Sequence, residues 1–405
     1  MNAFLLKVVL LFACLSAASM SLDAQVLAEP DPISSARVRI GPVGLTPSIA
    51  LTNVGVDSNV FNEVENPRRD FTLTLSPQLQ SWMRAGRSRL ASTTSLGLVY
   101  FRRFASERSV DGSVRGEWRY RLNRLVPWAR ALYSNGRQRA GYEVDLRTRR
   151  VTTDAGVGAD LAIGGRTRLT IDGRRLTYRH DADALFLGSS LQQTLTYTSK
   201  SGGLSYRYAL TPLTSLVLDS RVVRDRFPYL PVRNANSAQA MAGFDLEARA
   251  LISGQVRVGF RKFTPLGGAL SPFRGAVANV EAATVLGGRA RVELVGQRDV
   301  NYSFELTYPY YVLTGATLTI TPRLTDHWDV QARGGAQRLA YERLAGSDGP
   351  VTRLDRFGSW GGGVGYRLGR SIRLGFNVDR ERRRSPLQTR DYTGLRFGGS
   401  VIYGQ

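Results

Sequence analysis

Apolar and polar residues alternate with a period of two along almost the whole chain after residue 42, and this pattern limits the fold more than any other feature. In residues 289–304, Val292 and Leu294 belong to a mostly apolar set, while Arg291 and Glu293 belong to the polar set between them. Successive side chains of a β-strand point to opposite faces, so such a segment has one apolar and one polar face. Helical spacing would spread the same residues around a cylinder. The chain is therefore predicted to be all-β.

Turn residues divide this alternating part into about 18 predicted strands, with about 16 as the alternative count. They are expected near residues 43–56, 70–83, 89–104, 109–122, 127–139, 147–163, 166–180, 191–209, 214–228, 236–249, 254–265, 273–286, 289–304, 310–323, 327–343, 352–368, 371–384 and 392–404. Short turns such as 287–288 alternate with longer polar loops such as 57–69. This alternation predicts a transmembrane antiparallel up-and-down β-barrel. A soluble sandwich or propeller has shorter strands, of about 5–6 residues.

Aromatic residues gather at both ends of the predicted strands. Trp128 and Trp328 stand at short-turn ends, whereas Tyr100, Phe263 and Tyr302 stand at long-loop ends. Outer-membrane barrels carry an aromatic girdle at each membrane–water interface. We therefore expect the barrel to lie in the outer membrane of a Gram-negative-type bacterium.

The first residues have the pattern of an export signal. An apolar run at 8–18 is followed by small residues, and cleavage is expected after Ala24 or after Ala18. A transmembrane helix would need about 20 apolar residues, and Ser16 and Asp23 interrupt the run. The predicted organisation is a signal peptide at 1–24, a periplasmic lead-in at 25–42 and the outer-membrane barrel at 43–405.

The chain is strongly basic, with 55 Lys+Arg against 33 Asp+Glu and a formal net charge of +22. If the apolar faces meet lipid, the opposite faces line the lumen. The arginines expected there are Arg115, Arg119, Arg121, Arg249, Arg257, Arg261, Arg289, Arg291, Arg323, Arg333 and Arg373. A barrel of about 18 strands can hold an aqueous channel, and surplus arginine in it raises the local concentration of anions. The predicted function is a channel that passes, or helps to export, small anionic solutes or acidic polysaccharide.

Two alternatives for this charge stay open. Inward arginines and carboxylates can satisfy one another in a non-conducting structural barrel. Other arginines are expected at the outer rim, where their planar donor fork suits the phosphates of lipopolysaccharide in the surrounding lipid. These rim arginines are Arg147, Arg149, Arg150, Arg174, Arg175, Arg179 and Arg382–Arg384.

Other classes of function have less support. The sole cysteine is Cys14 and the two histidines stand far apart, so no Cys/His metal cluster is expected. An exported chain with arginines spread along strands does not suit nucleic acid, despite its charge. An outer-membrane hydrolase is the remaining alternative, because His180 beside Asp181 stands at a long-loop end and such a pair can activate water. We expect no enzymatic activity and no catalytic residue, cofactor or metal.

Several short segments resemble a known family. They are VGVDSNVF at 54–61, RDF at 69–71, LSP at 75–77 and YRYALTPLT at 206–214. These segments are similar to the outer-membrane β-barrel porins often encoded beside exopolysaccharide genes. The resemblance covers roughly residues 40–405. It implies an outer-membrane barrel with a link to polysaccharide secretion, and it brings no catalytic residues.

The last predicted strand also resembles a recognition signal. Arg396 and Gly398 are followed by alternating bulky residues up to Tyr403. The C-terminal strand of outer-membrane barrels has this form, which implies the barrel-assembly machinery as a partner. Gly404 and Gln405 follow here, where an aromatic terminus is commoner.

Overall fold

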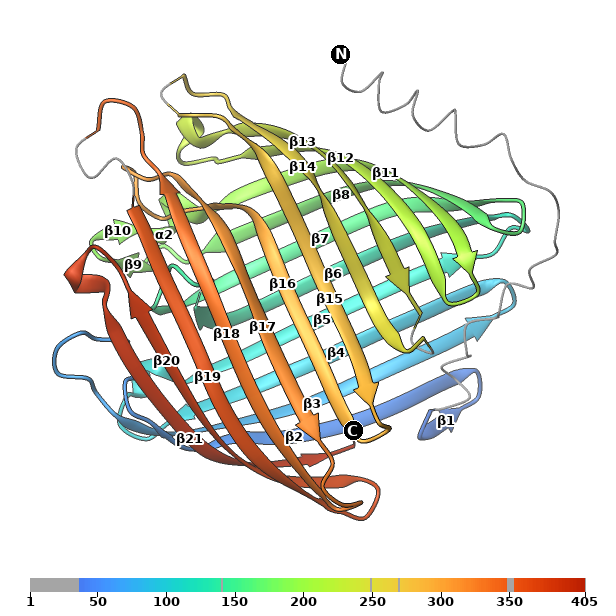
Figure 1. The fold of residues 1–405 in the computed structure, drawn as a ribbon, viewed down its shortest axis with the longest axis horizontal. Coiled ribbons are helices and arrows are strands. Elements are labelled where there is room, and N and C mark those ends of the chain that lie inside the picture. The colour runs from blue at the N-terminus through green and yellow to red at the C-terminus, as the bar shows by residue number, and fades with distance from the viewer. Residues whose placement is uncertain (1–35, 140, 248–249, 269, 348–352, 405) are drawn as a thin grey trace.

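The computed structural model describes residues 36–139, 141–247, 250–268, 270–347 and 353–404. In these residues, eighteen antiparallel strands follow one another around a closed barrel (Figure 1). Each strand pairs with its neighbours in the chain, because short turns can join only antiparallel partners. The predicted all-β up-and-down barrel of 18 strands is confirmed, and the alternative count of 16 is wrong.

The strands of the barrel are β2 (Val43–Asp57), β3 (Asp70–Ala85), β4 (Ser88–Phe101), β5 (Ser109–Tyr120), β6 (Leu125–Arg139), β7 (Arg147–Ile163), β8 (Thr167–His180), β11 (Tyr197–Thr211), β12 (Thr214–Arg226), β13 (Ala235–Leu246), β14 (Ile252–Pro265), β15 (Phe273–Leu286), β16 (Ala290–Tyr302), β17 (Tyr310–Pro322), β18 (Trp328–Glu342), β19 (Arg353–Leu368), β20 (Ile372–Arg384) and β21 (Tyr392–Tyr403). The long loops hold the remaining short elements: η1 (Ala105–Glu107), β9 (Leu185–Phe186), β10 (Ser189–Ser190), α2 (Leu191–Leu195), η2 (Pro231–Arg233) and η3 (Gln388–Arg390).

The barrel closes where its first and last strands meet. β21 pairs with β20 on one side and with β2 on the other, and Gly55 lies opposite Gly398 in this seam. The backbones approach closely here, since a Cβ on Gly55 would lie 2.0 Å from the Phe397 carbonyl oxygen. Closure pairs each of the eighteen described barrel strands on both sides, which matters because lipid offers no hydrogen bonds to an unpaired backbone.

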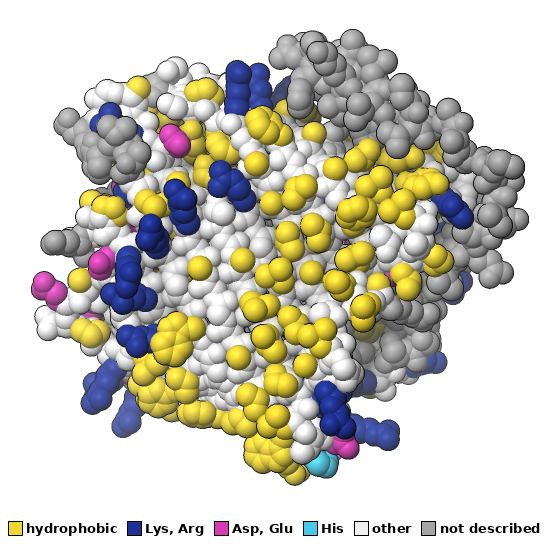
Figure 2. All heavy atoms as spheres, in the orientation of Figure 1, with side chains coloured by type: hydrophobic (Ala, Val, Ile, Leu, Met, Phe, Trp, Pro, Cys, Tyr) yellow, Lys and Arg dark blue, Asp and Glu magenta, His cyan; other side chains and the backbone are white. Residues whose placement is uncertain are grey.

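The outer wall is apolar although it is exposed. On β14, Val258 is 56% exposed and Phe260 is 49% exposed, whereas Arg257 between the outward residues is only 7% exposed. Figure 2 shows apolar side chains spread widely over the wall. A soluble protein has the opposite arrangement, with apolar residues inside, so this surface fits a lipid environment.

The largest difference from the predicted strands lies just before β11. The predicted strand begins at 191, but residues Leu191–Leu195 form α2, and the Ser190 hydroxyl accepts a hydrogen bond from the Gln193 backbone N–H (3.4 Å). Leu191 and Leu195 are buried in a cluster with Phe304 from a distant loop. Packing between loops therefore decides the structure of this segment.

The predicted signal peptide at 1–24 lies outside the described residues, as do residues 25–35 of the lead-in. The end of the lead-in contains β1 (Val38–Ile40), which forms a hairpin with the first residues of β2. Among the described residues, no helix is long and apolar enough to cross a bilayer.

Candidate functional site

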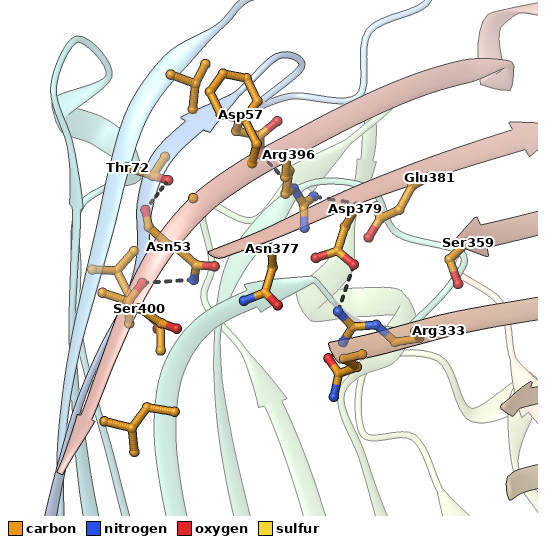
Figure 3. A pocket seen from close by; sticks show the side chains of 18 of the residues that line it. Asn53, Asp57, Thr72, Arg333, Ser359, Asn377, Asp379, Glu381, Arg396 and Ser400 are labelled. Atoms are coloured by element: carbon orange, nitrogen blue, oxygen red, sulfur yellow. Dashed lines mark hydrogen bonds and ion pairs between the residues drawn. The ribbon is translucent and has the colours of Figure 1, made fainter. Parts of the chain in front are cut away.

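A cavity of about 1030 Å³ lies inside the barrel, along β2–β4, β6, β7 and β17–β21 (Figure 3). Its lining extends from Arg373 and Ile402, near the short turns, to Asp57 and Val60 at the first long loop. The cavity therefore follows the barrel axis and forms part of the lumen.

Arginines outnumber carboxylates on the wall of this cavity, seven to four. Arg333 forms an ion pair with Asp379 (2.7 Å). Arg396 lies between Asp57 (2.9 Å) and Glu381 (3.5 Å), and all five side chains are seen in Figure 3.

The ion pairs of the wall are shared unequally: two arginines share Asp329, whereas Arg396 alone contacts two carboxylates. Asp329 is 1% exposed and pairs with both Arg373 (2.5 Å) and Arg367 (3.6 Å). Arg139, which also lines the cavity, donates to the carbonyl oxygens of Asp145 and Val60, and these are uncharged groups. The lumen wall thus keeps a positive surplus after its ion pairs are formed.

Glycines on β19 make room for these charged groups. A Cβ on Gly361 would lie 2.1 Å from the Asp379 Oδ1, and one on Gly365 would lie 2.2 Å from the Arg373 Nη2. Side chains from β20 thus lie over the glycines and within the lumen. The glycine cluster has a structural role here, because it leaves space for its neighbours.

We expect the double variant Gly361→Val/Gly365→Val to fold and to conduct less well, because Asp379 and Arg373 must then move further into the cavity. Single-channel conductance in a planar bilayer measures the effect. Gly358→Val is the matched control, because a Cβ on that glycine of the same strand has nothing within 4 Å. Equal conductance in both variants would contradict this role.

The structure separates the predicted lumen arginines into three groups. Seven lie in strands, on the face opposite the outward apolar residues: Arg115, Arg119, Arg257, Arg261, Arg291, Arg333 and Arg373. Arg121, Arg289 and Arg323 lie in or beside short turns. Arg249 lies outside the described residues. Of the whole set, Arg333 and Arg373 line the cavity.

On the other side of the barrel, the inward arginines are tightly paired. Arg257 pairs with Asp219 (3.0 Å) and with Asp245, while Arg261 pairs with Asp299 (2.7 Å). These charged groups neutralise one another, as expected for a structural barrel in which inward arginines and carboxylates pair.

The long loops that follow β6, β8, β12, β16 and β20 contact one another across one end of the barrel. We call them together the loop lid; its residues are 141–146, 181–196, 227–234, 303–309 and 385–391. Figure 1 shows β9, β10 and α2 at this end. The Glu143 carboxylate accepts hydrogen bonds from the Ser303 hydroxyl (2.6 Å) and the Phe304 backbone N–H (3.1 Å). Six strands separate β7 from β16 along the wall, so this contact crosses the mouth.

Buried arginines hold the lid together. Arg383 pairs with Asp145 (3.1 Å) and Asp355 (2.5 Å), and Arg390 also reaches Asp145 (3.2 Å). Arg353 on β19 pairs with Asp355 of the same strand and with Glu305 of a lid loop. Arg353, Arg383 and Arg390 are each at most 2% exposed. Since a buried charge without its partner is strongly unfavourable, these pairs keep the loops in place.

Glu143 is a buried titratable residue of the lid whose pKa is shifted toward neutral pH. Burial raises the pKa of Glu143 to about 7, although the hydrogen bond from Ser303 and the charge of Arg390 oppose this. Glu305 nearby raises the same pKa further. The charge state of one lid contact therefore changes near neutral pH.

Sequence reasoning missed most of the lid. Arg353, Arg383 and Arg390 come together from separate parts of the chain, and the loops that they join have no periodicity to show their contacts. The missed cavity residues Arg367 and Arg396 do carry a signal, because each alternates with outward apolar residues on its strand.

The alternative of a His–Asp pair is not supported by the geometry. His180 is 3% exposed, and among the described residues no hydrogen bond joins its ring to Asp181 or Asp183. The Asp181 carboxylate lies 3.9 Å from Arg149. The two side chains thus have separate surroundings.

A closed barrel with an apolar wall and a charged lumen is the architecture of an outer-membrane channel of the porin type. The chain belongs to the family described as "putative beta-barrel porin 2", whose model matches residues 31–403. It is therefore a β-barrel of the bacterial outer membrane.

Comparison with solved structures finds other barrels at low similarity. The siderophore receptor PirA from Pseudomonas aeruginosa has 9% identity and a TM-score of 0.41, covering 89% of this chain and 79% of that chain. A bacterial polysaccharide outer membrane secretin has 8% identity and a TM-score of 0.34, covering 89% of this chain and 98% of that chain. A triple mutant of the Rhodopseudomonas blastica porin has 9% identity and a TM-score of 0.34, covering 89% of this chain and 100% of that chain. Among curated proteins, none matches the chain.

Proposed function

We propose that this channel selects anions in the outer membrane of a Gram-negative-type bacterium, and that the loop lid is its gate. The observation that carries the proposal is the surplus of arginine on the cavity wall, where seven arginines face four carboxylates. A fixed positive charge in a water-filled channel attracts anions and repels cations. Small anionic solutes and acidic saccharides are the proposed substrates.

The reversal potential of the refolded protein in a planar bilayer, under a salt gradient, tests this function. We expect a potential of the sign that marks anion preference. Arg367→Gln/Arg373→Gln should reduce it, because the variant removes both arginines that share Asp329. Arg338→Gln, which removes an outward charge, is the control and should leave it unchanged.

A cation-selective or non-selective wild type would contradict the proposal, and so would a double variant with unaltered selectivity. A structural barrel is the second candidate, and the closed lid favours it. That candidate is supported if the folded protein shows no channel conductance even after a mutation has loosened the lid.

A further inference from the structure

We propose that the outer wall, just below the long loops, binds the phosphate groups of surrounding lipid headgroups through a belt of outward-facing cations. We call these residues the outer belt: Arg175, Lys200, Arg224, Lys262, Arg274, Arg298, Arg338, Arg356 and Arg384. Figure 2 shows a row of Lys and Arg side chains crossing the wall near the end where the long loops gather. This inference does not depend on what the channel conducts.

The belt residues are direct neighbours across the strands. Lys200 on β11 lies opposite Arg175 on β8 and also opposite Arg224 on β12. Residues in such register have Cβ atoms about 4.5–5.5 Å apart, and like charges there repel one another. All three side chains are exposed, and no ion pair joins them to a carboxylate among the described residues. The arrangement is therefore unfavourable until an anion lies over it.

The same arrangement recurs around the barrel. Lys262 on β14 lies opposite Arg274 on β15. Arg356 on β19 lies opposite Arg338 on β18 and opposite Arg384 on β20. Repetition on separate strands gives several cationic sites at one level of the wall.

The level of the belt indicates what it contacts. Every belt residue lies no more than five residues from the long-loop end of its strand. On the same faces, closer to the short turns, come apolar residues such as Ile171, Phe260 and Phe376, which are 60%, 49% and 47% exposed. Lipid-facing Arg or Lys costs about 2–4 kcal/mol at the bilayer midplane but only about 0–1 kcal/mol near an interface. The belt thus lies where the acyl chains end and the headgroups begin.

Phosphate is the headgroup chemistry that fits these residues. The guanidinium fork binds phosphate oxygens in pairs, and a lipid surface presents several phosphates at one height. Nearby, the Arg380 guanidinium lies 5.6 Å from the centre of the exposed Trp360 ring, an arrangement suited to a membrane–water interface. Of the rim arginines expected from sequence, Arg147 instead lines the cavity, and Arg174 and Arg383 point inward, to Asp154 and Asp355.

The test compares urea unfolding in phosphatidylcholine vesicles with unfolding in the same vesicles containing diphosphorylated lipid A. We expect lipid A to raise the unfolding midpoint of the wild type. Arg175→Gln/Lys200→Gln/Arg224→Gln should lose most of this gain. Arg87→Gln/Arg166→Gln/Arg370→Gln, which removes three exposed charges from the short turns, should keep it.

An equal gain in both triple variants would overturn the proposal. Inorganic phosphate in place of lipid A distinguishes the source, and an equal gain from it would overturn the assignment to lipid. If the first variant does not fold, Lys262→Gln/Arg274→Gln tests the same chemistry on another pair of strands.

Discussion

Replacing Asp145 with alanine is expected to open the long-loop end of the barrel and to produce sustained channel conductance. Asp145 is the common partner of Arg383 and Arg390, and the substitution leaves both of these buried arginines with less compensation. Breaking a buried ion pair costs about 3–5 kcal/mol. If this cost falls on the closed lid, the ratio of open to closed channels rises by about 10²- to 4 × 10³-fold.

Single-channel recording measures the open fraction directly. Asp183→Ala is the matched control, because Asp183 is an exposed aspartate in a lid loop and carries no ion pair with a described residue. Far-UV circular dichroism establishes that both variants keep the barrel. A folded Asp145→Ala protein with wild-type conductance would show that the loop lid does not gate the channel.

A pH rise from about 5 to about 8 is expected to loosen the lid and to increase the open fraction. The pKa of Glu143 is about 7 in the closed lid, against an ordinary value of 4.5. The closed lid therefore holds the proton more tightly than an open lid in which Glu143 meets water. Its stabilisation is complete below about 4.5 and is lost as the pH rises through about 7, with a total change of about 10²-fold in the equilibrium.

Charged groups from several lid loops face Glu143. Arg390 favours the carboxylate, Glu305 disfavours it, and Arg233 interacts with its charge from a third loop. Glu143→Gln imitates the protonated group, so we expect this variant to remain closed at both pH values. Glu65→Gln alters an exposed glutamate of another long loop and should retain the pH response. A response that survives in Glu143→Gln would assign the effect to another group.

The strands could be predicted well from the sequence because the barrel imposes one simple rule on them. Every strand has lipid on one side and the lumen on the other, so alternation persists for its full length, as on β14 and β20. The predicted ranges 147–163 and 273–286 coincide with β7 and β15. The same rule placed Arg257, Arg333 and Arg373 on inward faces.

Alternation cannot say which inward residues meet. Arg333 on β18 pairs with Asp379 on β20, two strands away. Asp329 is shared by Arg367 and Arg373. These contacts depend on the register between strands, which a single sequence does not display. Whether the charges cancel or leave a surplus follows from those pairings.

The sequence by itself determined the all-β class, the strand count and the inside and outside of the wall, since each depends on local periodicity and turn residues. Only the tertiary structure decided that loops far apart in the chain close one end. It also decided that Glu143 is buried there and that Arg175, Lys200 and Arg224 stand in register. Such contacts join residues far apart in the chain, and they form only when the closed barrel brings its loops and neighbouring strands together.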